Sequence, residues 1–581
     1  MGNIRRILVY VMRYKPLLVI PSLMMLLSIG LDMFNPILSQ IVIDRIIKGK
    51  EFDLIGYTLG AMLLISLLRG ILNYGRNYLT EKLAENVGLD IRKDLFDHIQ
   101  SLPFQFFDGM NTGELMSRMT GDIDSIRAVL AYGLMLFLEN AFYFTISSVI
   151  LFSLNWALAL VCLLTMPFIG WVTIKLDKKM DEVYEKISDQ AAALNTKAEE
   201  NIAGVRLVKA FARENFERKK FQAENAKNFE LGKEEVMIRA KYYPIIETLG
   251  GLSLVFLLVA GGYAVIQKTI TVGTLVAFTG YIWMLIWPMR MLGWLSSMLA
   301  QCNASAGKIF KIMDTGVTIK SPDNPVKVEK IEGNVRFENV SFAYKDEPVL
   351  KDITLEAKAG QMIAIMGATG AGKTSLINLI GRYYDCTEGR ILVDGIDVKK
   401  HDLNTLRGSM AVVMQDTFLF SDTIESNIAF GNPNATKEEI IRAAKAAQAH
   451  EFIMELPEGY ATIVGERGIG LSGGQKQRIS LARALVKNPS ILILDDATSA
   501  VDMETEYRIQ QALKTIMKGR TTFVIAHRIS SVRNADEIIL LEGGRIIERG
   551  RHEDLLKKRG KYYQLYMEQY KDFDEFLKVV V

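Results

Sequence analysis

The chain has 581 residues, of which 49% are hydrophobic and 23% are charged, and its formal net charge is +3. Because the net charge is so small, the protein as a whole has no strong positive electrostatic field. We therefore expect no nucleic-acid partner. The positive mean hydropathy over this length indicates a membrane part joined to a soluble part rather than several soluble domains. The cysteines, Cys162, Cys302 and Cys386, fit neither a disulfide framework nor a zinc site.

Six apolar stretches in the first half of the chain are long enough to span a bilayer, which takes about 20 helical residues. Arg69 and Arg76 interrupt the second stretch, so its ends are the least defined. The first stretch is too long for a signal peptide and other spans follow it. The predicted spans cover roughly residues 17–44, 54–79, 130–153, 155–176, 243–267 and 274–300.

The loops between the spans differ in charge. Segment 177–242 is rich in Lys and Arg, whereas spans three and four meet at Leu154 and Asn155 without a basic residue. The positive-inside bias therefore predicts a multi-pass protein of the cell membrane with its N-terminus, long loops and soluble part in the cytoplasm. Apolar residues at three- and four-residue spacing predict that spans two to five continue as helices well beyond the bilayer. Residues 3–14 are expected to form a short helix on the cytoplasmic face.

A phosphate-binding loop follows the membrane part. Segment 335–344, VRFENVSFAY, alternates like a strand, and the apolar run MIAIM leads into a stretch that fits G-x-x-x-x-G-K-[ST]. The glycines let backbone N–H groups converge on phosphate oxygens at the start of a helix. Lys373 is expected to neutralise the β- and γ-phosphates of ATP, and Thr374 to hold Mg²⁺. The predicted ATP contacts are Gly367, Ala368, Thr369, Gly370, Ala371, Gly372, Lys373, Thr374 and Ser375.

Two adjacent carboxylates end the apolar strand ILILD, residues 491–495. Such a strand is the usual second half of a phosphate-binding-loop site, so we expect Asp495 to hold Mg²⁺ together with Thr374. Asp496 stands where a base or water-orienting group faces the attacking water, which makes it the main catalytic candidate.

Residues 471–483, LSGGQKQRISLAR, stand between the phosphate-binding loop and the ILILD strand. With this motif the sequence resembles the ATP-binding cassette (ABC) transporters over essentially the whole chain. Six spans ahead of one cassette resemble an ABC exporter half-transporter of the multidrug or lipid type. The other matching segments are VVMQD with Gln415, VGERG at 464–468, SAVD at 499–502 and VIAHR with His527.

The resemblance implies roles that spacing alone does not assign. Tyr344 matches the aromatic residue that stacks on adenine, Gln415 matches a residue of the magnesium and catalytic site, and His527 matches a catalytic histidine. The resemblance also implies that a signature segment contacts the ATP held by a second chain. That segment comprises Leu471, Ser472, Gly473, Gly474 and Gln475.

The fold class that follows is an all-α six-helix transmembrane domain before an α/β P-loop nucleotide-binding domain with a helical subdomain. The expected transmembrane domain with its cytoplasmic extensions covers residues 1–310, and a linker covers 311–332. The cassette covers 333–570 and a C-terminal tail covers 571–581.

One cassette per chain implies a head-to-tail dimer. Each ATP would lie between Gly367–Thr374 of one chain and Leu471–Gln475 of the other. The resemblance implies that ATP closes the pair and that hydrolysis releases it, which drives export of an amphipathic or hydrophobic substrate by alternating access. Segments near Phe104–Met110 and Lys209–Glu214, at the turns of the long loops, are the expected contacts between spans and cassettes.

Asp496 departs from the family pattern, since most members have Glu at this position. Asp is shorter by one C–C bond, about 1.5 Å, and a misplacement of ~1 Å can slow a reaction about 100-fold. An Asp here resembles the degenerate subunit of heterodimeric exporters, whose intact signature completes the other chain's site. A heterodimer with a second half-transporter is therefore favoured, and a homodimer is the alternative.

The substrate is the least constrained part of the prediction. Charged residues in or near the spans often line a transport pathway, and Glu139 and Glu247 are the candidates for the substrate cavity. The competing interpretation is that these charges bind one another, since Asp32, Arg69 and Arg290 also lie in or near the spans. A lipid flippase instead of a multidrug pump remains open, as does an ATP-gated channel or regulator on the same fold. The six spans exclude a DNA-handling ATPase of the ABC kind.

Overall fold

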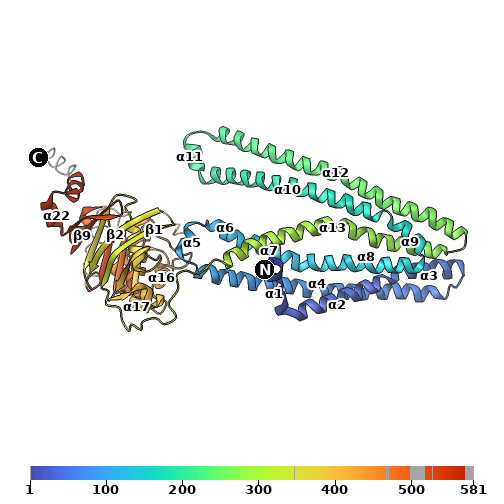
Figure 1. Ribbon diagram of the computed structural model, residues 1–581, viewed down its shortest axis with the longest axis horizontal. Coiled ribbons are helices and arrows are strands. Elements are labelled where there is room, and N and C mark those ends of the chain that lie inside the picture. The colour runs from blue at the N-terminus through green and yellow to red at the C-terminus, as the bar shows by residue number, and fades with distance from the viewer. Residues whose placement is uncertain are drawn as a thin grey trace. The chain divides into compact units, whose positions relative to one another are not determined.

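The computed structural model describes residues 2–345, 347–465, 468, 470–496, 517, 519–526 and 528–569 (Figure 1). The chain divides into two compact units. The first comprises Met1–Ser101 and Asn111–Thr315, and the second comprises Leu102–Met110 and Gly316–Val581. A short segment of the second unit is therefore inserted in the sequence of the first.

The first unit is built from helices throughout its described residues. Short π-helical or 3₁₀ turns join some of them: η1 (Met12–Tyr14), η2 (Val42–Lys48), η3 (Arg118–Asp122) and η4 (Val129–Gly133). The helices are α1 (Asn3–Val11), α2 (Lys15–Asp32), α3 (Phe34–Ile41), α4 (Leu54–Ser101), α6 (Thr112–Ser117), α7 (Ile123–Ala128), α8 (Leu134–Leu154), α9 (Trp156–Leu163), α10 (Met166–Ala203), α11 (Val205–Ala210), α12 (Glu214–Ile266) and α13 (Val272–Met313).

Six helical stretches of this unit are long and apolar enough to cross a membrane, which confirms the six predicted spans. The helices also continue beyond the bilayer as predicted, since α4 has 48 residues and α12 has 53. Arg69 and Arg76 do not interrupt α4. The stretches are Asn3–Lys48, Leu54–Ser101, Thr112–Leu154, Trp156–Ala203, Glu214–Ile266 and Val272–Met313.

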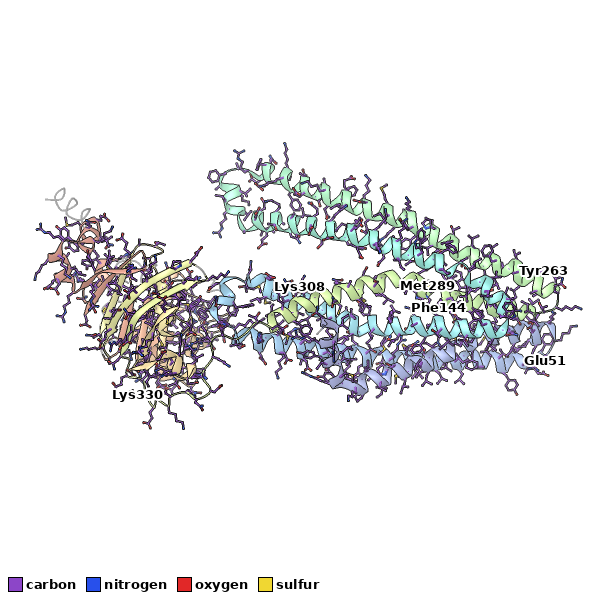
Figure 2. The ribbon with its side chains drawn as sticks, in the orientation of Figure 1. Glu51, Phe144, Tyr263, Met289, Lys308 and Lys330 are labelled. Atoms are coloured by element: carbon purple, nitrogen blue, oxygen red, sulfur yellow. The ribbon has the colours of Figure 1, made fainter. Side chains whose placement is uncertain are left out.

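The helices run lengthwise, and α10 packs along α12 with α11 at the tip of the pair (Figure 1). Gly204 ends α10, and the short helix α11 follows it directly. Figure 2 shows Glu51 and Tyr263 at one end of the helical unit and Lys308 toward the other. Phe144 of α8 and Met289 of α13 pack against the buried core of the bundle. The loops after α3 and α12 therefore lie at the same end of the bundle.

The second unit contains two sheets. An antiparallel sheet has the order β2-β1-β4-β5, and a second sheet has the order β10-β9-β3-β8-β7-β6, parallel except for the pair β9 and β10. The first sheet consists of β1 (Val335–Tyr344), β2 (Glu347–Ala357), β4 (Glu388–Val393) and β5 (Ile396–Asp397). The second consists of β3 (Met362–Gly367), β6 (Met410–Val413), β7 (Ile491–Asp495), β8 (Thr521–Ile525), β9 (Glu537–Glu542) and β10 (Arg545–Gly550).

Helices surround these sheets, and four of the described helices fall between β6 and β7 and form a helical part of the unit, as the predicted fold class includes. These four are α16 (Ile424–Ala429), α17 (Lys437–Ala446), α18 (His450–Glu455) and α19 (Gly473–Val486). The remaining helices and 3₁₀ turns of the described residues are α5 (Phe104–Asp108), α14 (Lys373–Ile380), η5 (Val398–Lys400), α15 (Leu403–Gly408), η6 (Gly459–Ala461), α21 (Ile529–Val532) and α22 (His552–Lys558).

The mostly parallel sheet is buried on both faces. Along β7, Ile491 and Ile493 join the hydrophobic core on one face, and Leu492 and Leu494 join the core on the other. A strand covered on both sides reads as a continuous apolar run, which is why ILILD shows no alternation. Since β8 alone separates β3 from β7, the carboxyl ends of β3 and β7 lie near each other, at the edge where ligands bind in such sheets.

Candidate functional site

The phosphate-binding loop begins at Gly367, the last residue of β3, and ends at Lys373, the first residue of α14. Gly367 has φ of +152° and Gly372 has φ of +97°, a region that favours glycine. A Cβ atom would lie 2.3 Å from the Leu541 carbonyl oxygen at Gly367, and 2.7 Å from Leu350 Cδ2 at Gly372. The loop therefore keeps its backbone close to its neighbours because these positions have no side chain, and its N–H groups lead into the start of α14.

Lys373 is buried inside this loop, with 7% of its surface exposed. Its Nζ donates hydrogen bonds to the carbonyl oxygens of Gly367, at 2.8 Å, and Ala368, at 3.0 Å. Burial lowers the pKa of Lys373, and the nearby Asp495 and Asp496 partly oppose that shift. The loop thus holds a cation in a poorly hydrated place, where an anionic phosphate is a stronger partner than two carbonyl groups.

Thr374 and Asp495 meet beside the loop. The Thr374 hydroxyl donates a 3.0 Å hydrogen bond to Asp495 Oδ2, and Asp495 is 6% exposed at the end of β7. A hydroxyl and a carboxylate are the oxygen ligands that Mg²⁺ prefers. The pair therefore fits the predicted magnesium site.

Asp496 follows in a left-handed backbone conformation, with φ of +46°, which Asp tolerates better than most residues. Its N–H donates a 3.0 Å hydrogen bond to the Ile525 carbonyl oxygen at the end of β8. Gln415, which the resemblance assigns to the same site, is exposed in the segment after β6. His527, residues 499–502 and residues 466–467 of the VGERG segment lie outside the described residues.

Tyr344, the predicted adenine-stacking residue, lies at the end of β1. Its hydroxyl is 3.1 Å from the Ser375 hydroxyl in α14, and its ring packs edge-on against Tyr384 at 5.2 Å between centroids. It lines a cavity of about 610 Å³ together with Gln105 and Asp108. Tyr344 therefore contacts the first turn of α14, which directly follows the phosphate-binding loop, although the two are distant in sequence.

The signature segment starts a helix. Ser472 caps α19 by accepting a 3.3 Å hydrogen bond from Gln475 N, and Gln475 Oε1 accepts a 2.8 Å bond from Ser472 N. Ser472 and Gly473 are exposed, whereas Leu471 packs partly against the core. Among the residues that the structure describes, no hydrogen bond joins Leu471–Gln475 to Gly367–Thr374.

Helix α5 belongs to the cassette unit. Phe104 stacks on Tyr383 with 4.7 Å between ring centroids, and Tyr384 donates to Asp108 Oδ2 at 2.9 Å. The predicted contact through Phe104–Met110 is confirmed, whereas no sequence motif singled out Tyr383 and Tyr384 as the residues that contact it. The second predicted segment, Lys209–Glu214, forms the turn between α11 and α12 in the helical unit.

The charged residues of the spans form ion pairs with one another. Glu139 lies 3.0 Å from Arg76, Glu247 lies 2.8 Å from Arg290, and Asp32 pairs with Arg69. Pairing offsets part of the cost of holding charges in an apolar bundle. Of the two predicted cavity residues, Glu247 lines a cavity of about 720 Å³ between α10, α12 and α13.

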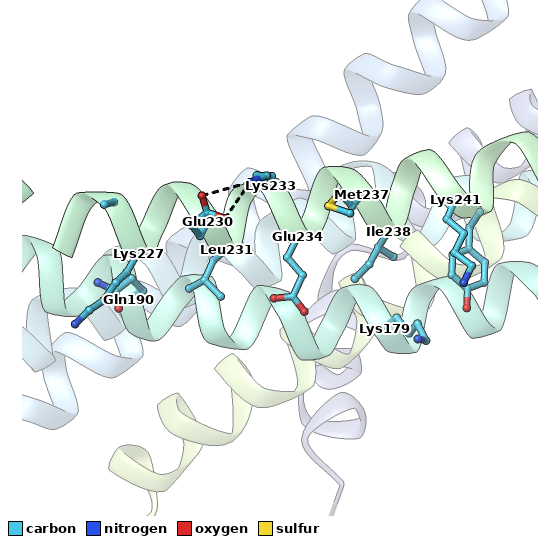
Figure 3. A pocket seen from close by; sticks show the side chains of 12 residues that line it. Lys179, Gln190, Lys227, Glu230, Leu231, Lys233, Glu234, Met237, Ile238 and Lys241 are labelled. Carbon is cyan, nitrogen blue, oxygen red and sulfur yellow. Dashed lines mark hydrogen bonds and ion pairs between the residues drawn. The ribbon is translucent and has the colours of Figure 1, made fainter. Parts of the chain in front are cut away.

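That cavity also contains residues that the sequence analysis missed, Asp177 and Asp181 of α10 and Ser297 of α13. The available signal was the four-residue spacing of two Asp residues directly after the fourth predicted span. A second cavity of about 1000 Å³ lies along α10 and α12 (Figure 3). Its charged lining is mainly basic, with Lys179, Lys227, Lys233, Lys241, Glu230 and Glu234.

Comparison with known proteins identifies both parts of the chain. Residues 19–289 match the model of the ABC transporter transmembrane region, and residues 350–499 match the ABC transporter model. The chain is 38% identical over 572 residues to an ATP-dependent lipid A-core flippase of Syntrophus aciditrophicus, covering 98% of this chain and 95% of that protein. It is 39% identical over 576 residues to a putative multidrug export ATP-binding/permease protein, YgaD, of Bacillus subtilis, covering 97% and 99%.

A solved structure agrees with these matches. A bacterial Atm1-family ABC exporter with ATP bound superposes with a TM-score of 0.82 at 30% sequence identity, covering 96% of this chain and 98% of that one. The chain belongs to the ABC transporter family, and it carries a transmembrane region and an ATP-binding domain of the exporter type in one polypeptide.

Proposed function

We propose that this chain is one half of a dimeric exporter that uses ATP hydrolysis to move an amphipathic or hydrophobic substrate, a drug-like compound or a lipid, out across the cell membrane. The observation that carries the proposal is the contact of Thr374 with Asp495 beside the buried Lys373, in a chain with six membrane spans. The N-terminus and the cassette lie in the cytoplasm, where ATP is supplied.

The triphosphate of ATP lies along the loop Gly367–Ser375. Lys373 exchanges its two carbonyl contacts for phosphate oxygens, and Tyr344 stacks on adenine after its hydroxyl leaves Ser375. Thr374, Gln415 and Asp495 would hold Mg²⁺, which would supply positive charge near the phosphates when bound.

Asp496 orients the attacking water, with Gln415 and His527 completing the catalytic group. Its position directly after β7 supports this role, but its side chain is one methylene shorter than the Glu usual in the family. We therefore infer slow hydrolysis at this chain's own site.

The dimer follows from the signature segment. The start of α19 presents backbone N–H groups beside the exposed Ser472 and Gly473, and such a helix N-terminus favours an anion. Within the described chain the signature segment makes no hydrogen bond with the phosphate-binding loop. This supports a role in contacting the ATP that a second chain holds. A second half-transporter with a competent carboxylate is the favoured second chain, and a copy of this chain is the alternative.

The effect of amphipathic compounds on the rate of ATP hydrolysis tests the proposal. We expect purified protein in lipid nanodiscs to hydrolyse ATP only with Mg²⁺, and amphipathic compounds to change the rate at saturating ATP. The Lys373→Ala variant provides the background rate. Hydrolysis that no amphipathic compound alters would instead support a regulator on the same fold, and an ATP-dependent ion current would support a channel.

A further inference from the structure

We propose that the cavity between α10, α12 and α13 binds the transported molecule as an organic cation, with Asp177 and Asp181 as its counter-charges. This inference rests on the exporter function proposed above and narrows its substrate class. The cavity has a volume of about 720 Å³, which falls within the range of about 300–1,000 Å³ that is common for small-molecule sites.

One face of α10 forms the acidic wall of the cavity. Thr173, Asp177, Asp181 and Tyr184 all line it, and their spacing of three or four residues places them on one side of the helix. Each successive pair is close enough for both side chains to reach one ligand.

Asp177 and Asp181 share a single hydrogen-bond donor from α13. Ser297 Oγ lies 3.1 Å from Asp177 Oδ1 and 2.9 Å from Asp181 Oδ1, and a hydroxyl has only one proton to donate. No basic side chain in the described part of the chain lies within 4.0 Å of either carboxylate. Neither carboxylate therefore forms an ion pair with a basic side chain of the described chain.

The other charges that line the cavity are paired. Arg290 forms a 2.8 Å ion pair with Glu247, and Arg239 forms a 2.6 Å ion pair with Glu235 on its own helix. Since both Arg side chains have acidic partners, the charge left for a ligand is that of the two Asp residues. A cation gains from that charge and an anion is repelled.

Aromatic rings and two polar atoms without a hydrogen-bond partner among the described residues, the Thr173 hydroxyl and Arg290 Nε, complete the site. Trp287, Trp294 and Tyr243 line the cavity and remain about half exposed, so their faces can contact apolar groups and a cation. Thr173 lines the same cavity and is 4% exposed, yet its hydroxyl has no hydrogen-bond partner among the described residues. A buried hydroxyl without a partner is costly, and a polar atom of a bound molecule would satisfy it.

The position of the cavity along the helices suits uptake from the cytoplasm. Asp177 directly follows the predicted fourth span, and Tyr243 begins the predicted fifth. In the proposed orientation both lie at the cytoplasmic ends of their spans. The larger cavity in Figure 3 has four Lys and two Glu residues, so an organic anion would favour that cavity instead.

Two probes of similar shape and opposite charge test the proposal. We would measure equilibrium binding of tetraphenylphosphonium and of tetraphenylborate to the purified full-length assembly in one detergent, without ATP. We expect Asp177→Asn with Asp181→Asn to weaken phosphonium binding at least about tenfold, and to leave borate binding unchanged or stronger. The matched control, Glu182→Gln with Glu185→Gln, removes two charges from the same helix outside the cavity, and should change binding by less than about twofold.

A conservative pair separates charge from folding. Asp177→Glu with Asp181→Glu keeps both charges and should retain phosphonium binding, and Ser297→Ala should retain it as well. The proposal would be overturned if the Asn pair and the Glu pair lost phosphonium affinity equally. It would also be overturned if the wild-type protein bound tetraphenylborate and did not bind tetraphenylphosphonium. ATP hydrolysis that neutral amphiphiles stimulate would show that the exporter function stands even if the cation site fails, whereas the absence of any such response would count against the exporter function itself.

Discussion

Lys373 donates both of its observed hydrogen bonds to carbonyl groups of its own loop. Its ammonium group is therefore positioned to bind a phosphate. We predict that Lys373→Ala weakens ATP binding at this site at least about tenfold, because hydrogen bonds to charged groups contribute about 1.5–3 kcal/mol each. Titration with a fluorescent ATP analogue measures the effect. Lys358→Ala, an exposed lysine in the same unit, is the control, and equal affinities in the two variants would contradict the assignment.

Tyr344 gives a milder prediction. Loss of a ring that stacks on a base costs about 1–3 kcal/mol of binding free energy in nucleic-acid proteins. Tyr344→Ala should therefore weaken ATP binding by that amount of free energy. Tyr344→Phe removes only the contact with Ser375 and keeps the ring, so it should bind ATP nearly as well as wild type. If triphosphates that lack a purine bind equally well to the intact protein, Tyr344 does not stack on the base.

At this scale the sequence predicted residues that local motifs fix and missed those that long-range packing creates. Lys373, Thr374 and Asp495 follow from spacing, because a strand, a glycine loop and a helix leave little freedom between them. The contact of Tyr344 with Ser375 and the shared hydroxyl between Asp177 and Asp181 depend on elements distant in sequence. The four-residue spacing of the two Asp residues places them on one face of α10, but it does not predict that Ser297 of α13 contacts both.

Helix α5 lies in the sequence between α4 and α6, and it packs against Tyr383 and Tyr384 of the cassette. Burial and the hydrogen bond to Asp108 raise the pKa of Tyr384 above its usual range, so the phenol remains a donor. We predict that Tyr384→Phe and Asp108→Asn each reduce substrate stimulation of ATP hydrolysis, and that the double variant is no worse than either single one, because all remove the same bond.

Tyr383→Phe is the control for that series. It keeps the ring that stacks on Phe104 and should preserve stimulation. Additive losses from Tyr384→Phe and Asp108→Asn would mean that the two residues act separately.

The elements themselves were largely predictable. The alternating segment 335–344 is β1, the run ILILD is β7, and the apolar and amphipathic stretches around the second span form the single helix α4. The breaks were harder to predict, because Gly204 ends α10 within a stretch whose periodicity continues past it. The order of the strands in the sheets could not be predicted from local patterns, because it is set by packing between segments far apart in the chain.

At the level of the whole assembly, a change at Asp496 tests how the two proposed ATP sites divide the hydrolysis. In an assembly of two different chains, Asp496→Asn should leave most steady-state ATP hydrolysis intact, because the second chain's site carries the turnover. In an assembly of one kind of chain, the same change should reduce turnover by about 100-fold or more, because a water-orienting group is lost from both sites.

Mass determination of the purified assembly has to precede that ATPase measurement. Asp496→Glu is the matched variant and should raise turnover at this chain's site, because it restores reach toward the water. A two-chain assembly that loses its activity on Asp496→Asn would contradict the degenerate-site interpretation. A one-chain assembly that is indifferent to the change would show that another group positions the water.

We expect ATP hydrolysis to drive a substrate against its concentration gradient, and transport into sealed proteoliposomes with outward-facing cassettes measures this. With Mg²⁺ and ATP outside, a fluorescent amphiphile should accumulate in the lumen above its external concentration, and a non-hydrolysable ATP analogue or the Lys373→Ala variant should abolish or strongly reduce the accumulation. If ATP instead dissipates a preformed gradient, or if accumulation proceeds equally with the analogue, the molecule is not an ATP-driven exporter.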